Sequence, residues 1–94
     1  MSGARVVPLT KPIQAHGAEL AELELAEPSA EDIMELGYPF LVHQGGAIEL
    51  RPKVVAQYVV RLGKVPLPSV KKLHPADLQA CTAEVMGFFG ESAP

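Results

Sequence analysis

The sequence has little of what disulfide formation, membrane insertion or aromatic recognition requires. It contains one cysteine and no tryptophan in 94 residues, and aromatic residues make up 5% of it. One cysteine cannot form an internal disulfide, so a reducing, cytoplasmic setting is the simpler interpretation. No apolar run approaches the roughly 20 residues that span a bilayer. No signal-type apolar stretch follows the first residues.

The charges are few but sharply segregated. The net charge of −3 gives no overall attraction to nucleic acid or to an anionic membrane. Between Pro12 and Leu50 lie eight acidic residues and no lysine or arginine, whereas between Arg51 and Lys72 lie six basic residues and no acid. Two interpretations stay open. The blocks are either solvated faces that attract each other within one fold, or docking faces for partners or for copies of the chain.

The N-terminal part predicts a β-hairpin. Residues 5–9 are strand-like, and residues 20–25 alternate apolar and acidic side chains with a period of two. Between them, Gly17 can take the positive φ of a tight turn. Pro8 and Pro12 would confine the first strand to an edge position, because proline has no N–H to donate.

A short helix and an ambiguous segment follow. Ser29 is a candidate N-cap with acidic residues in the next turn, and Gly37 is a candidate stop. Residues 38–50 fit either a second small hairpin or an irregular loop.

The C-terminal half predicts two amphipathic helices. Pro52 opens the first, which Gly63 can end; its apolar side chains are Val54, Val55, Tyr58, Val59 and Leu62. We expect one helical turn at residues 69–73, a cap at His74, and a final helix at residues 75–89.

The final helix carries two different stripes. The apolar stripe consists of Leu78, Cys81, Thr82, Val85, Phe88 and Phe89. The opposite stripe of small residues consists of Ala76, Ala80, Ala83 and Gly87. The small stripe packs against the preceding helix or is simply exposed to solvent as a run of good helix formers; the alternative is a seam with another molecule. Phe88 continues the core stripe, whereas Phe89 is the better candidate for an exposed anchor.

These patterns predict the fold class α+β. We expect a small single domain over residues 1–94, with an N-terminal β-hairpin followed by about three α-helices and a short helical turn. Residues 1–4 and 91–94 are expected to fray.

The sequence shows no converging set of catalytic groups. His16, His43 and His74 fall in a turn, a loop and a cap position, without a metal ligand at a suitable offset. Cys81 lies on an apolar stripe, which favours a core role over that of a nucleophile. The basic block has no recognisable nucleic-acid module and few aromatics to stack on bases. We therefore predict no catalytic, cofactor-binding or metal-binding residue, and no enzyme.

Three segments, taken in order, match a known pattern. The first runs from Val7-Pro8-Leu9 to the helix start Glu27-Pro28-Ser29-Ala30-Glu31-Asp32. The second is Tyr58-Val59-Val60-Arg61-Leu62 with Val65-Pro66-Leu67-Pro68-Ser69-Val70. The third runs from Leu73-His74-Pro75-Ala76-Asp77-Leu78 to Val85-Met86-Gly87-Phe88-Phe89-Gly90. In this order and length the chain resembles the tail assembly chaperones of contractile-tailed (Mu-like) bacteriophages. Residues 38–50 lie outside the match.

The resemblance implies a role in virion assembly. Such chaperones bind the tape measure protein and keep it soluble until tail tube subunits polymerise around it, and they are absent from the mature virion. It also implies action in the cytoplasm of the bacterial host. A longer product of programmed frameshifting is common in the family and would link the chaperone to the tail tube protein; Phe88-Phe89-Gly90 could be encoded by a slippery sequence.

The expected partner contacts lie on the last two helices. They are Tyr58, Arg61, Ala80, Ala83, Gly87 and Phe89. A homo-oligomer stays open as a further assembly, whereas nucleic acid and membrane are not expected partners. A small structural virion protein and a nucleic-acid-binding phage regulator are the alternative functions.

Overall fold

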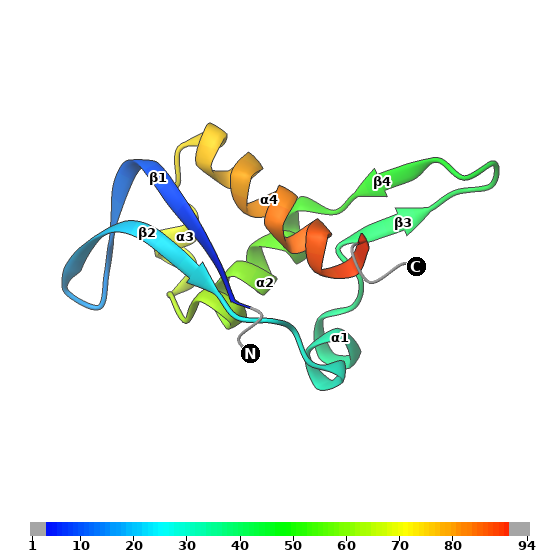
Figure 1. Ribbon diagram of the computed structural model, residues 1–94, viewed down its shortest axis with the longest axis horizontal. Coiled ribbons are helices and arrows are strands. Elements are labelled where there is room, and N and C mark those ends of the chain that lie inside the picture. Colours follow the sequence, from blue (N-terminus) through cyan, green and yellow to red (C-terminus); the bar gives the residue numbers. More distant parts are fainter. Residues whose placement is uncertain (1–3, 91–94) are drawn as a thin grey trace.

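The computed structural model describes residues 4–90 and begins with a long antiparallel hairpin (Figure 1). Strand β1 (Arg5–Ala15) pairs with β2 (Ala18–Leu25). His16 and Gly17 join them with φ of 54° and 75°, the two positive values that a two-residue hairpin turn of type I′ needs. The predicted hairpin is confirmed, and its strands are longer than the sequence pattern indicated. Except for Ala4, the termini expected to fray lie outside the described residues.

The middle of β1 leaves its partner strand and is held from the other side. Pairing with β2 is interrupted between Pro8 and Ile13. There the backbone N–H groups of Thr10 and Lys11 donate to the carboxylate of Asp77 at 2.9 and 3.2 Å. Asp77, in the first turn of helix α4 (Pro75–Gly90), thus replaces acceptors that β2 does not supply.

A short helix and a second hairpin come next. Helix α1 (Ala30–Leu36) begins with the predicted cap at Ser29, which forms a capping box with Asp32, and it ends at Gly37 with φ of 81°. Residues 38–50 then form a hairpin, so the first of the two open alternatives is correct. Its strands are β3 (Phe40–Val42) and β4 (Ile48–Leu50), and the hairpin projects from the body of the molecule (Figure 1).

The C-terminal helices follow the prediction with two local corrections. Helix α2 (Pro52–Gly63) ends one residue later than expected, because Lys64 takes the left-handed conformation with φ of 56°. A Cβ on Gly63 would lie 3.2 Å from Leu25 Cδ2, so this glycine allows close packing on β2. The predicted turn at residues 69–73 is instead helix α3 (Leu67–Val70), which begins two residues earlier.

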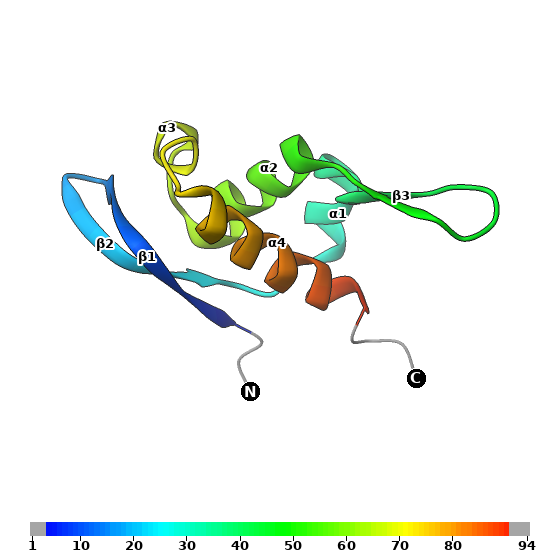
Figure 2. The same ribbon diagram turned by 90° about the horizontal axis from the view of Figure 1, so that it is seen from above.

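The core lies where α2 and α4 meet the inner face of the first hairpin (Figure 2). Its largest fully buried apolar side chains come from all three elements: Tyr58, Leu23, Leu25, Val7, Val55, Val59, Val85 and Cys81. The structure is therefore α+β, with an N-terminal hairpin followed by helices, as predicted. Pro39, at the base of the second hairpin, is also fully buried, whereas strands β3 and β4 add no residue to this buried set.

Candidate functional site

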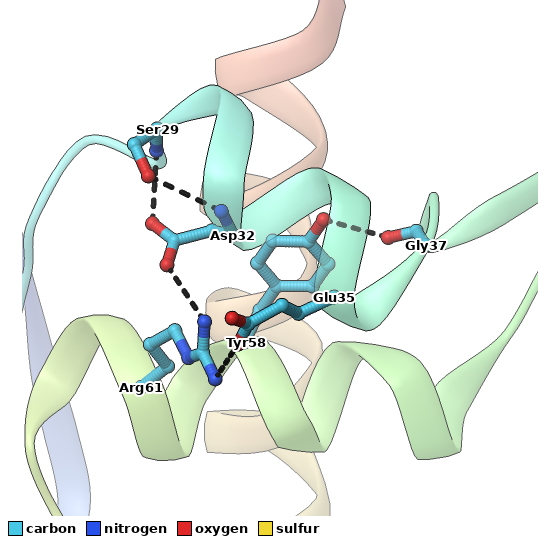
Figure 3. A network of polar contacts seen from close by, with 6 residues as sticks. All are labelled: Ser29, Asp32, Glu35, Gly37, Tyr58 and Arg61. Atoms are coloured by element: carbon cyan, nitrogen blue, oxygen red, sulfur yellow. Dashed lines mark hydrogen bonds and ion pairs between the residues drawn. The ribbon is translucent and has the colours of Figure 1, made fainter.

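Helix α1 is attached to α2 by a polar network rather than by buried side chains (Figure 3). The guanidinium of Arg61 donates to Asp32 at 3.1 Å and forms an ion pair with Glu35 at 2.6 Å. On the neighbouring turn of α2, the hydroxyl of Tyr58 donates to the carbonyl of Gly37 at 2.6 Å. Here the acidic and basic blocks attract each other within the fold, which supports the first interpretation of their segregation.

Two pKa shifts follow from this network. The backbone N–H of Ser29, and after it the guanidinium of Arg61, hold the pKa of Asp32 below its usual value despite some desolvation. Burial raises the pKa of the Tyr58 phenol, and the charge of Asp32 adds to this effect. Tyr58 therefore stays a hydrogen-bond donor at neutral pH, and Arg61 is engaged within the chain.

Four aromatic rings connect α2, α4 and the base of the second hairpin. The ring of Phe89 lies 5.7 Å from those of Tyr38 and Tyr58 and 6.0 Å from that of Phe40, each in an edge-to-face arrangement. Phe89 is half-buried, so its expected place as an exposed anchor is wrong. Phe88, also half-buried, lies under the guanidinium of Arg5, whose carbon is 4.8 Å from the ring centre.

An apolar groove lies between α2 and α4. It encloses about 500 Å³ and is lined by Leu50, Pro52, Val55, Leu78, Gln79, Thr82, Ala83 and Met86. None of these side chains is charged. The lining has two polar side chains, Thr82 and Gln79. The Thr82 hydroxyl donates to the carbonyl of Leu78 at 2.8 Å within α4. The groove is suited to an apolar ligand.

The second hairpin extends this apolar character away from the body. Its register pairs Phe40 with Leu50 and Val42 with Ile48, and paired residues of a two-stranded sheet share a face. These four side chains form what we call the hairpin face. Val42 and Ile48 are 64% and 60% exposed, which is unusual for large apolar residues placed side by side.

The opposite face of the same hairpin is mixed, because its register pairs Leu41, which is 44% exposed, with Glu49. His43 Nε2 lies 2.7 Å from Glu49 Oε1, and both side chains are exposed. The hairpin face, with four apolar side chains, is therefore the more apolar of the two faces.

The groups that could support chemistry have structural roles. Burial, and after it the charges of Asp77 and Glu84, raise the pKa of the Cys81 thiol to about 11, so Cys81 is a core residue as predicted. His16 lies 2.8 Å from the carbonyl of Lys64, and His74 accepts the N–H of Ala76 at the start of α4. Within residues 4–90, histidine, cysteine and carboxylate side chains do not gather in a group that could hold a metal ion.

The residues expected to bind a partner do not form one surface. Tyr58 is fully buried, Phe89 is half-buried beside it, and Arg61 pairs with α1. On α4, Ala80 packs against the core. Ala83 lines the apolar groove, whereas Gly87 is half-buried outside its lining.

Sequence reasoning missed two parts of this site. The hairpin face lay in the segment left open, although the alternation of Ile48 and Leu50 with Glu49 was a usable signal. Met86 and Gln79 of the groove fell between the two stripes assigned to α4. Their place depends on how α4 is rotated against α2, which a helical period alone does not determine.

None of the helices formed by residues 4–90 has the length and hydropathy to cross a bilayer.

Comparison with known protein families finds a match over most of the chain. Residues 6–90 match the family described as phage tail assembly chaperone proteins, E, or 41 or 14. No curated protein and no solved structure matches the chain. The family match extends from the first hairpin to the last turn of α4 and includes both the groove and the hairpin face. The chain therefore belongs to the phage tail assembly chaperone family.

Proposed function

We propose that this protein binds the tape measure protein of its phage and keeps it soluble until the tail tube polymerises around it. The family match over residues 6–90 carries the proposal. A role in tail assembly is shared by the family, and it requires protein contact rather than catalysis. The uncharged groove and the exposed hairpin face support it, because a chaperone for an apolar chain needs accessible apolar surface.

The proposal includes a place and a time of action. The chaperone acts in the cytoplasm of the bacterial host and leaves before the virion is complete. A longer frameshift product would connect it to the tail tube protein. The coding DNA tests this last point, since a slippery heptamer over codons 87–90 with an overlapping downstream frame is required.

Co-expression is the decisive experiment. The tape measure protein from the same phage is produced alone, with this chain, and with an unrelated small protein at the same level. We expect most of the tape measure protein in the soluble fraction only when this chain is present. Equal solubility in all three cases would refute the proposal.

Two further measurements separate the alternatives. Mass spectrometry of purified virions should not find this chain at stoichiometric amounts, whereas a structural virion protein would be found. A nucleic-acid-binding regulator would bind DNA or RNA with an affinity that falls steeply between low and high salt.

A further inference from the structure

The apolar groove and the hairpin face share Leu50. We propose that together they form one docking surface for the apolar side of an α-helix of the tape measure protein. The inference rests on the proposed function and adds where the partner binds and what feature of it is recognised.

The two parts are continuous along the chain and in space. Leu50 lines the groove and belongs to the hairpin face, on the same side of the pleat as Ile48. Phe40, opposite Leu50, packs on Phe89 in the last turn of α4. The surface therefore runs from Leu78 along α4 and out onto the second hairpin.

Charge decides which kind of ligand can enter. No lining residue of the groove and no residue of the hairpin face is charged. The hollow on the other side of Leu50 and Pro52 differs, because its lining includes three charged residues, Glu49, Arg51 and Lys53. A charged segment would lose its hydration in the groove without gaining a counter-charge. The complementary ligand is an uncharged stripe of apolar side chains.

The shape of the surface favours a helix over a strand. The groove runs between two helices, and an amphipathic helix in such a groove is a common mode of recognition, with anchors at i, i+3 or i+4, and i+7. Strands β3 and β4 have only three residues each, so an added strand would gain few backbone hydrogen bonds.

Within residues 4–90, a second copy of the chain offers no such helix. Helix α2 buries Val54, Val55 and Tyr58 in the core, and helix α4 buries Cys81 and Val85 there. Among the described residues outside segment 38–50, the large exposed apolar side chains lie apart on different elements: Val6, Met34 and Leu67. The acidic residues that flank Met34 on α1 are poorly suited to an uncharged groove.

The test uses two variants of the full chain, each with a matched control. Ala83→Glu places a charge in the groove, and Ala76→Glu places the same charge at an exposed position of α4 outside it. Ile48→Glu disrupts the hairpin face, and Met34→Glu changes an apolar side chain that is 83% exposed on α1. All four positions are exposed, so the variants should fold. Circular dichroism and thermal melting verify this.

The readout is the amount of tape measure protein that an affinity-tagged form of each variant retains after co-expression. We expect Ala83→Glu and Ile48→Glu to retain at least about tenfold less tape measure protein than the parent chain, as for substitutions of central interface residues. Both controls should retain nearly as much as the parent chain. For the parent chain, retention should change little between low and high salt, because apolar contacts are not screened.

Three results would overturn the inference. One is full retention by Ala83→Glu and Ile48→Glu, and another is a steep loss of binding by the parent chain in high salt. The third is a dimer of the parent chain that Ile48→Glu dissociates while tape measure binding is unchanged, since the surface would then join two copies. If the parent chain retains no tape measure protein at all, the proposed function itself fails, which is a separate outcome.

Discussion

The carboxylate of Asp77 accepts the backbone N–H of Thr10 at 2.9 Å, across 67 residues of sequence. The same carboxylate accepts the N–H of Lys11 and the hydroxyl of Thr10, both at 3.2 Å. Asp77 is 1% exposed. One acidic side chain thus joins the start of α4 to the part of β1 that has left its partner strand.

Asp77→Ala should lower the thermal midpoint clearly, because it leaves two backbone N–H groups without their acceptor. Asp77→Asn keeps one acceptor oxygen, so its thermal midpoint should lie between those of Asp77→Ala and the parent chain. Glu19→Ala, on the exposed surface of β2, is the control and should have little effect. Equal midpoints for Asp77→Ala and Glu19→Ala would contradict this role.

The stability that Asp77 contributes should depend on pH. The backbone N–H of Thr10, with smaller contributions from Lys11, holds the pKa of Asp77 below its usual 3.8 although desolvation opposes this. When the pKa of a carboxyl is lower in the folded state, its stabilisation of the fold is fully present at pH values above the unfolded-state pKa. That stabilisation is lost as the pH falls through the folded-state pKa. Urea unfolding of the parent chain and Asp77→Asn should therefore differ at pH 7 and converge below pH 3.8. A constant difference would show another origin.

Phe89→Ala should destabilise the fold by about 2–3 kcal/mol, because Phe89 meets three aromatic rings. Phe88→Ala should cost less, about 1–2 kcal/mol, since the ring of Phe88 lies under the half-buried guanidinium of Arg5 rather than among other rings. This order is the reverse of the one expected from the helical stripe. Urea denaturation of both variants decides between the two orders, with Phe89→Leu as an intermediate case.

Gly37→Ala should cost about 1–3 kcal/mol, because φ of 81° with ψ of 177° is a region that only glycine adopts readily. The carbonyl of the same residue accepts the hydroxyl of Tyr58, so the change should also loosen the base of the second hairpin. Gly90→Ala is the control, since a Cβ there would meet nothing within 4 Å. Urea unfolding gives both free energies, and a neutral Gly37→Ala would show that the turn can relax.

Cys81 should resist thiol reagents in the native protein. The side chain is fully buried and its pKa is about 11, so at pH 8 roughly one thiol in a thousand is ionised. We expect modification by a disulfide reagent to be slow in buffer and immediate in denaturant. The raised pKa also means that the contribution of Cys81 to stability is lost as the pH rises from 9.0 toward 11. Rapid labelling of the native chain at pH 8 would contradict this placement.

Local signals accounted for much of the fold. Gly17 marked the first turn, Ser29 and Gly37 bounded α1, and Pro52 opened α2. Each acts through a backbone angle or a hydrogen bond a few residues away, so its effect can be deduced from neighbouring residues alone. The same reasoning placed α3 two residues too late, because Pro68 tolerates a helix that already begins at Leu67.

The candidate site was far less predictable. Tyr58 and Arg61 lie on the helix where they were expected, yet one is buried and the other is paired with α1. Of the six residues expected to bind a partner, Ala83 is the one that lines the apolar groove. The periodicity of α4 defined which residues share a stripe, but it did not define which other elements each stripe packs against.

By itself, the sequence determined the first hairpin, helices α1, α2 and α4, the α+β class and the absence of a membrane-length apolar run, because these depend on composition and on contacts within a few residues. Its resemblance to the chaperone family was also sufficient to indicate the role. Only the tertiary structure decided that Asp77 holds β1, that Phe89 closes an aromatic cluster, and that Leu50 joins the groove to the hairpin face. These depend on which elements meet and at what rotation, and that is set by packing the whole core at once.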